Sequence, residues 1–262
     1  MKIGHCNNPR KNITEEVRWI GENGFEFVDL FLEPDRALPE SMDVRALKEL
    51  LKQYSLHVVS HTAWYLPLGS PLPELRREAV RIVKGYFRFL ERLDCRFLTV
   101  HANWPCELFS AEEGIQFQVE SLARITESAR EFGVRILYEP LDGPRDTLRN
   151  LSRIVKEVPD LLVHLDIGHA NITGIQPSAY FNTFGDRVAH IHLHDNNGVS
   201  DLHLPLGAGK INWKQTIRQI RKGYDGTITL EIFSRDKDYV LLSKEKLRQL
   251  WEEAGAEGNA DR

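Results

Sequence analysis

Short apolar segments alternate with longer amphipathic segments along almost the whole chain. The apolar segments carry few polar residues at alternate positions, which is typical of strands covered on both faces of a parallel sheet. The predicted strands are Lys2–Cys6, Phe27–Phe31, His57–Ser60, Phe97–Val100, Arg135–Tyr138, Leu161–Leu165, Val188–His192 and Thr227–Leu230. The predicted helices are Thr14–Asn23, Asp43–Tyr54, Leu75–Leu93, Glu112–Phe132, Thr147–Val158, Pro177–Phe184, Trp213–Lys222 and Ser243–Glu253.

Eight strand–helix units in 262 residues favour one closed barrel. Parallel strands need helical cover, and a (β/α)8 barrel of about 250 residues provides it within a single domain. An open doubly wound sheet is the alternative, but the sequence contains neither the GxGxxG nor the Walker motif that would place a nucleotide there. We therefore predict a single-domain α/β TIM barrel over residues 1–262, with residues 254–262 as a frayed tail.

The charge and the cysteines of the chain argue against several classes of protein. A net charge of −4 gives no general attraction to nucleic acid or to an anionic membrane. Cys6, Cys95 and Cys106 are scattered and odd in number, so they predict no disulfide framework and suit a reducing compartment. The first residues lack the apolar core of a secretory signal, and no apolar run is long enough to cross a bilayer. We expect a cytoplasmic protein without a membrane partner.

The last six predicted strands each end at, or just before, a residue that can bind a metal ion or transfer a proton. These residues are His61, His101, Glu139, Asp166, His192 and Glu231. Ordinary residue usage would give His, Asp or Glu at such a position about one time in six, so six in succession indicate a shared site. Because the active site of a parallel barrel lies at the carboxyl ends of its strands, we expect these side chains to meet there.

Further candidate ligands follow the sixth and seventh strands. Asp166 and His169 are expected on one tight turn, with Gly168 at the bend. Asp201 and His203 are two residues apart, so they share a face if the segment is extended. Imidazole and carboxylate groups are the ligand types that hold zinc, manganese and iron, and the stretch Val188–Trp213 is dense in both.

Three other residues are candidates for contacts with a substrate. Trp64 and Trp104 lie in loops just after His61 and His101, where an aromatic wall of a pocket is expected. His194 follows the seventh strand, and the sequence leaves open whether it is a ligand, a support for a ligand or a substrate contact.

The remaining histidines are interpreted as supporting or structural residues. His190 is expected to face opposite to His192 and to pack or to support a ligand. His5, His57 and His164 are expected to be structural.

Several stretches resemble the xylose isomerase-like TIM-barrel superfamily, which includes sugar isomerases and epimerases and the AP endonuclease family 2 (endonuclease IV) enzymes. The stretches are VSHTAWYLPLGSP, LTVHANWP, ILYEPLDG, VHLDIGHAN, IHLHDNNGVSDLHLPLGAGKINW and ITLEIF. Sugar epimerases of this superfamily hold one divalent ion, often manganese, with residues that match Glu139, Asp166, His192 and Glu231. Endonuclease IV-like proteins hold three zinc ions with residues that match His61, His101, Glu139, Asp166, His169, His192, Asp201, His203 and Glu231.

The resemblance implies two alternative activities. The first is a metal-dependent isomerase or epimerase of a small sugar, sugar phosphate or keto-polyol, with one to three zinc or manganese ions. Glu139 and Glu231 would then transfer a proton, and His169 would bind a substrate oxygen or supply a proton. The second is an endonuclease IV-like zinc phosphodiesterase, for which the partner would be nucleic acid.

We favour the isomerase because an enzyme that grips duplex DNA usually carries a basic stripe. The candidate cations are interpreted as solvated surface residues: Arg10, Lys11, Arg36, Arg145 and Lys210. A binding protein with a purely structural metal is disfavoured by the number of polar groups at one rim. A homodimer is an expectation at the level of the family.

Overall fold

The computed structural model describes residues 1–260, and the side chains of residues 1–256. Within them, eight parallel strands close into a barrel in the order β1 to β8, with β8 paired to β1. The strands are β1 (Lys2–Cys6), β2 (Phe27–Leu32), β3 (His57–Thr62), β4 (Phe97–His101), β5 (Arg135–Glu139), β6 (Leu162–Asp166), β7 (Val188–Leu193) and β8 (Thr227–Leu230). The closed barrel confirms the fold class predicted from the alternating pattern.

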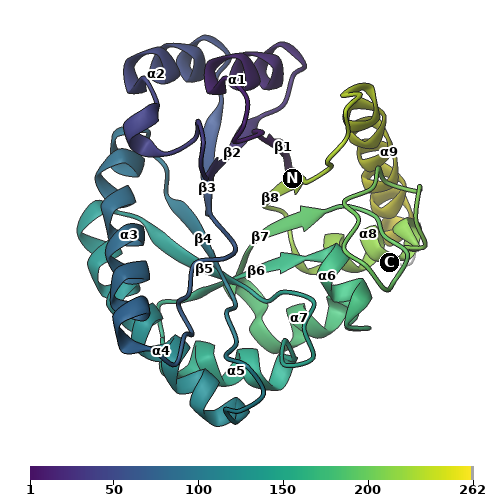
Figure 1. The fold of residues 1–262 in the computed structure, drawn as a ribbon. Helices are drawn as coiled ribbons and strands as arrows, with labels where there is room; N and C mark the ends of the chain where they lie inside the picture. Colours follow the sequence, from purple (N-terminus) through teal and green to yellow (C-terminus); the bar gives the residue numbers. More distant parts are fainter. Residues whose placement is uncertain (261–262) are drawn as a thin grey trace.

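The helices form an outer ring around the strands (Figure 1). In the described residues the α-helices are α1 (Ile13–Glu22), α2 (Val44–Gln53), α3 (Pro73–Arg92), α4 (Ala111–Ala129), α5 (Leu148–Glu157), α6 (Ile167–Ile172), α7 (Pro177–Phe184), α8 (Trp213–Gly223) and α9 (Asp238–Ala260). Their inward faces follow the helical period: α3 buries Val80, Val83 and Phe87. None of the described helices is long and apolar enough to span a bilayer.

The turn predicted between Asp166 and His169 is wrong, because these residues begin the short helix α6. Asp166 is the N-cap of α6, and its Oδ1 accepts a hydrogen bond from the backbone N–H of His169 at 2.8 Å. Gly168 therefore lies inside a helix rather than at a bend. Glycine is needed there for space, because a β-carbon would lie 1.8 Å from Cε1 of His194.

The predicted opposite orientation of His190 and His192 is also wrong. Both side chains point into the barrel, where their Nε2 atoms lie 3.2 Å and 2.8 Å from Oδ2 of Asp29. The physical reason is the two-residue period of a strand, which places residues i and i+2 on the same face. His190 lies one layer deeper than His192.

Helix α9 continues to Ala260, beyond the predicted end of the last helix at Glu253, and the fraying of residues 254–262 stays a prediction. Trp251 and Ala254 pack against the core, and the guanidinium of Arg221 lies 5.3 Å from the centre of the Trp251 ring. Residues 261 and 262 of the predicted tail lie outside the described part of the chain.

Polar side chains replace the aliphatic residues that usually fill the middle of such a barrel. Asp29, Thr99, His164, His190 and Thr229 are each at most 2% exposed. Most of them stand two residues before a predicted ligand in the same strand, so they form the layer just beneath the site. Buried polar groups are costly unless they are hydrogen-bonded. Here Thr99 Oγ1 lies 3.0 Å from His164 Nδ1, and Thr229 Oγ1 donates to Asp29 Oδ2 at 2.9 Å.

Candidate metal centre

A cavity of about 760 Å³ opens at the carboxyl ends of the strands. Seven of the nine predicted metal ligands line it: His61, His101, Glu139, His169, Asp201, His203 and Glu231. The other two lie directly behind this wall. Asp166 Oδ1 is 3.8 Å from His169 Nδ1, and His192 Nδ1 is 3.1 Å from Glu231 Oε2. The structure therefore brings all nine residues together at one end of the barrel.

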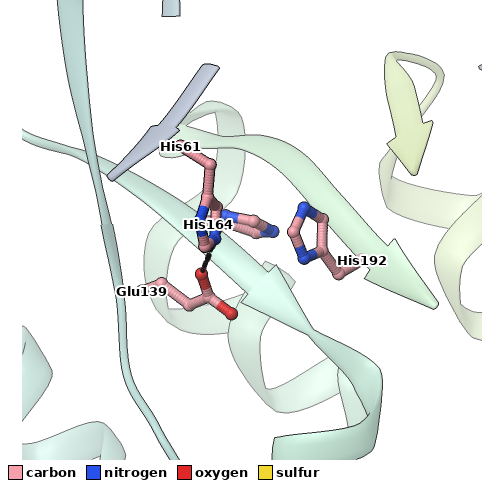
Figure 2. Close-up of side chains that lie close together, drawn as sticks. All are labelled: His61, Glu139, His164 and His192. Atoms are coloured by element: carbon pink, nitrogen blue, oxygen red, sulfur yellow. Dashed lines mark hydrogen bonds and ion pairs between the residues drawn. The ribbon is translucent and has the colours of Figure 1, made fainter. Parts of the chain in front are cut away.

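Glu139, at the end of β5, is the centre of a first group of ligand atoms. Its Oε2 lies 3.0 Å from His61 Nε2 and 3.3 Å from His101 Nε2. His164 Nδ1 is also 3.3 Å from this oxygen, and Figure 2 shows His61, His164 and His192 gathered beside the carboxylate. His164 thus lies inside the cluster, which its position within an apolar strand did not reveal.

Asp166, His192 and Glu231 form a second group, whose ligand atoms lie within 4.8 Å of one another. The Nε2 of His192 lies 2.8 Å from a carboxylate oxygen of Asp29, and a carboxylate can only accept, so Nε2 carries a hydrogen. The other ring nitrogen, Nδ1, then faces Glu231 Oε2 at 3.1 Å and Asp166 Oδ2 at 3.8 Å. The carboxylates of Asp166 and Glu231 and the ring nitrogen of His192 therefore need a positive charge between them, either a proton or a metal ion.

A third group joins the loop after β7 to α6. His203 Nε2 lies 2.9 Å from Asp201 Oδ2, and His169 Nε2 lies 3.4 Å from the same oxygen. His203 has a φ of 45°, so the segment is not extended as expected, yet the two side chains still meet. His194 is fully buried between Asp166 Oδ1 at 3.1 Å and Asp201 Oδ1 at 3.4 Å, and it lies behind the cavity wall.

The nitrogen and oxygen atoms of the site are suited to bind a divalent cation. Several buried atoms have no hydrogen-bond partner in the described structure, and they include His61 Nδ1, His101 Nδ1, Asp166 Oδ2 and His169 Nδ1. Unpaired buried polar atoms are rare in proteins, and an ion is a standard reason for them. Carboxylate and imidazole ligands at this density are those that hold zinc or manganese.

The carboxylates of the site are ionised in spite of their burial. Burial raises the pKa of Glu139, but the neighbouring His164 and His101 bring it well below its usual value. Burial likewise raises the pKa of Asp166, and His194 is the main neighbour that lowers it below its usual value. Both groups are therefore ready to bind a cation at neutral pH.

Several imidazoles of the site hold a proton in the ion-free protein. Burial lowers the pKa of His203, but the carboxylates of Glu231 and Asp201 raise it to about 9. The pKa values of His169 and His192 are also raised well above their usual value, because neighbouring carboxylates outweigh burial. These protons and a metal ion compete for the same nitrogen atoms.

Asp195 organises the loop that carries Asp201 and His203. It is fully buried, and its Oδ2 accepts hydrogen bonds from Trp213 Nε1 and the backbone N–H of Gly207, both at 2.7 Å. Its backbone also pairs with that of Leu204. Asp195 is thus a structural residue of the glycine-rich turn.

The two tryptophans predicted to contact a substrate lie in different surroundings. Trp64 is 59% exposed and lines the cavity. Trp104 is not among the described residues that line it, and its Nε1 donates to Asp146 Oδ1 at 2.9 Å.

Sequence reasoning missed several other residues of the cavity. Phe31 stacks on His61 with ring centres 4.4 Å apart, and Phe233 stacks on His203 at 4.2 Å. Lys11, interpreted from the sequence as a solvated surface residue, also lines the cavity. Phe233 lies two residues after Glu231, so its position beyond the eighth strand could have suggested it.

Comparison with protein families gives one match over most of the chain. The model of the xylose isomerase-like TIM barrel family matches residues 17–255. A crystal structure of a D-tagatose 3-epimerase-like protein has a TM-score of 0.87 and 28% sequence identity, and the alignment covers 98% of this chain and 99% of that chain.

Curated relatives cover nearly the same span. Uncharacterized protein MJ1311 of Methanocaldococcus jannaschii is 28% identical over 92% of this chain and 86% of its own length. Fructoselysine 3-epimerase of Escherichia coli O157:H7 is 23% identical over 88% of this chain and 90% of its own length. Other relatives are named probable endonuclease 4, from Aquifex aeolicus, and inosose dehydratase, from Lacticaseibacillus casei.

Proposed function

The chain belongs to the xylose isomerase-like TIM barrel family, and from that membership we propose that it is a divalent-metal-dependent isomerase or epimerase of a small sugar, sugar phosphate or keto-polyol. The observation that carries this proposal is the meeting of Glu139, Glu231 and His169 at one cavity, beside buried ligand atoms that lack partners. The sugar epimerases among its relatives support the same class of reaction.

The metal would be zinc or manganese, and between one and three ions would bind. The set for a single ion is Glu139, Asp166, His192 and Glu231; the additional ligands for a second and a third ion are His61, His101, His169, Asp201 and His203. When bound, the metal supplies Lewis-acid polarisation of a substrate carbonyl.

The two glutamates would carry the proton. Glu139 and Glu231 reach the cavity from β5 and β8, two strands that are not neighbours in the barrel. One carboxylate removes the proton from the carbon next to the carbonyl, and the other returns it. His169, whose Nε2 lies 3.4 Å from Asp201 Oδ2, binds a substrate oxygen or supplies a proton.

The walls of the cavity would hold the sugar and limit water. Phe31, Trp64 and Phe233 give the cavity aromatic sides, and such rings pack against the C–H face of a sugar. Trp104 and His194, which do not line the cavity, would support it from behind through Asp146 and Asp166.

Exchange of substrate protons with water tests this proposal. Ketoses, ketose phosphates and keto-polyols are incubated with the protein in heavy water with added manganese, cobalt, magnesium or zinc. Deuterium at the carbon next to the carbonyl is the expected result. Absence of exchange in every class, with protein of confirmed metal content, counts against the proposal.

An endonuclease IV-like zinc phosphodiesterase, acting on nucleic acid, is the second candidate. The observation that favours it is the third group, in which His169 and His203 meet Asp201, because a site for three ions would need these additional ligands. Elemental analysis and a cleavage assay together separate the candidates. One ion per chain, together with an abasic-site duplex left uncut by zinc-loaded protein, counts against the phosphodiesterase.

The proposal also includes the setting of the enzyme. We propose a cytoplasmic homodimer with a small carbohydrate as its partner. Size-exclusion chromatography with light scattering tests the dimer, and a monomeric mass contradicts it.

A further inference from the structure

Asp29 is a buried carboxylate in the middle of β2, and it is neither a predicted ligand nor part of the cavity wall. It is 1% exposed. Its Oδ2 accepts hydrogen bonds from His192 Nε2 at 2.8 Å, His190 Nε2 at 3.2 Å and Thr229 Oγ1 at 2.9 Å. A buried charge is costly even when it is paired, and an aliphatic residue would usually fill this layer of a barrel. The carboxylate therefore calls for a functional explanation.

We propose that Asp29 is a positioning residue for His192: it holds the imidazole as its Nε2–H form and leaves Nδ1, which faces Asp166 and Glu231, as the nitrogen that would bind the metal. The inference rests on the metal dependence proposed above. An imidazole has two ring nitrogens, and the hydrogen bond made by one decides which atom is left to bind a metal. With Nε2 committed to Asp29, Nδ1 is the nitrogen that faces Glu231 Oε2, at 3.1 Å.

The other partners of Asp29 hold the carboxylate in the orientation that this role needs. His190 Nε2 lies 3.2 Å from Asp29 Oδ2 and 3.0 Å from Thr229 Oγ1, and it carries a hydrogen because the carboxylate can only accept. The other nitrogen, Nδ1, lies 2.7 Å from Thr227 Oγ1. Thr229 donates to the same oxygen from β8. The second oxygen, Oδ1, has no hydrogen-bond partner in the described structure. All the hydrogen bonds of the carboxylate therefore converge on the oxygen that faces His192.

Two substitutions at this position and one matched control test the proposal. Asp29→Val removes the acceptor, whereas Asp29→Asn keeps an acceptor oxygen without the charge. Ser121→Ala is the control, because it deletes another buried side-chain hydrogen bond, to the backbone carbonyl of Leu68, and neither of these residues lines the cavity. Zinc affinity is measured by competition with a chelator. The ring nitrogens of 15N-histidine-labelled protein are followed by NMR, a readout that does not depend on activity.

In the wild-type protein loaded with zinc, we expect His192 to carry its hydrogen on Nε2 and to bind the metal through Nδ1. Carboxylates that support a ligand histidine typically contribute 10- to 100-fold to metal affinity. We therefore expect a loss near 100-fold in Asp29→Val, together with loss of the fixed tautomer. A loss near tenfold is expected in Asp29→Asn, and the zinc affinity of Ser121→Ala should stay within about twofold of the wild type.

Three results would overturn the proposal: wild-type affinity in folded Asp29→Val, metal bound through Nε2 of His192, or a wild-type protein that binds no metal. If Asp29→Val does not fold, the zinc affinity of Asp29→Asn tests the proposal instead. An affinity equal to that of the wild type would then overturn it. Another outcome is that the protein binds zinc with an affinity that depends on Asp29 and yet exchanges no sugar protons. That result would contradict the proposed activity but support the role of Asp29.

Discussion

Gly168 in α6 and His194 after β7 are so close that a β-carbon on Gly168 would lie 1.8 Å from Cε1 of His194. His194 is fully buried, and its Nε2 lies 3.1 Å from Asp166 Oδ1, so the imidazole cannot move without disturbing a predicted ligand. Overpacking of this kind typically costs about 1–3 kcal/mol. We expect Gly168→Ala to lower the free energy of unfolding, measured by urea unfolding. We also expect it to lower the number of metal ions bound per chain, measured by elemental analysis.

A second helical glycine provides the control for this substitution. Gly85 in α3 is exposed, and a β-carbon there would meet no atom within 4 Å. Gly85→Ala should therefore stabilise the protein by roughly 0.5–1 kcal/mol, the gain expected from helix propensity alone. If Gly168→Ala were equally stabilising and fully metal-loaded, the contact between Gly168 and His194 would have no energetic consequence.

Replacement of Glu231 by glutamine should separate metal binding from proton transfer. The Oε2 of Glu231 lies 3.1 Å from His192 Nδ1, and a glutamine keeps one oxygen for the metal but cannot accept a proton from carbon. We expect deuterium exchange into the substrate to fall by at least about 100-fold, the usual contribution of a general base. NMR in heavy water measures the exchange, and elemental analysis shows whether metal is retained.

A glutamate distant from the cavity gives the comparison for this experiment. Glu120 in α4 pairs with Arg76 at 2.7 Å, and it is not among the residues that line the cavity. Glu120→Gln should keep the exchange rate of the wild type. Undiminished exchange in metal-loaded Glu231→Gln would remove the proposed mechanism.

The fold and most of the site could be predicted because both depend on local patterns. The alternation of apolar and amphipathic segments reports the period of each element, and strand ends in a parallel barrel meet at one rim. His61, Glu139 and Glu231 could therefore be placed together although they are far apart in the sequence. Their convergence on one cavity needed only approximate strand boundaries.

The rest of the site depends on packing across the barrel, which a local pattern does not encode. Asp29 lies within an apolar run, and only the closed barrel shows that it faces His190 and His192. Helix α6 was missed because its capping residue, Asp166, is also a predicted ligand, and a glycine two residues later suggested a bend. Such errors occur at residues where the function requires one structure and the local sequence favours another.

Metal binding should release protons at neutral pH. The carboxylates of Glu231 and Asp201 overcome burial and raise the pKa of His203 to about 9, and the pKa values of His169 and His192 are raised as well. A metal binds the neutral imidazole, so these protons must leave. Titration calorimetry in buffers of different ionisation enthalpy should show at least about one proton released per chain at pH 7. Metal binding without proton release would contradict the prediction that the metal binds these protonated histidines.

The same shift predicts how the ion-free protein responds to pH. A histidine whose folded pKa is raised stabilises the protein fully below its unfolded pKa of 6.5, and this stability is lost as pH rises through about 9. Urea unfolding of chelator-treated protein should therefore show a contribution that declines over that interval. A His203→Gln variant should lack that contribution. An identical pH dependence in the variant and the wild type would show that His203 does not supply it.

Two cations beside the cavity predict a preference for substrates that carry a phosphate. Lys11 follows β1 and Arg235 follows β8, which are paired strands, and both side chains line the cavity. Charge reversal, as Lys11→Glu and Arg235→Glu, should raise KM for a ketose phosphate at least about tenfold and leave that for the free ketose nearly unchanged, since a charge-assisted hydrogen bond contributes about 1.5–3 kcal/mol. Lys48→Glu, on the exposed face of α2, is the control. Equal losses for both substrates would show that these cations do not recognise phosphate.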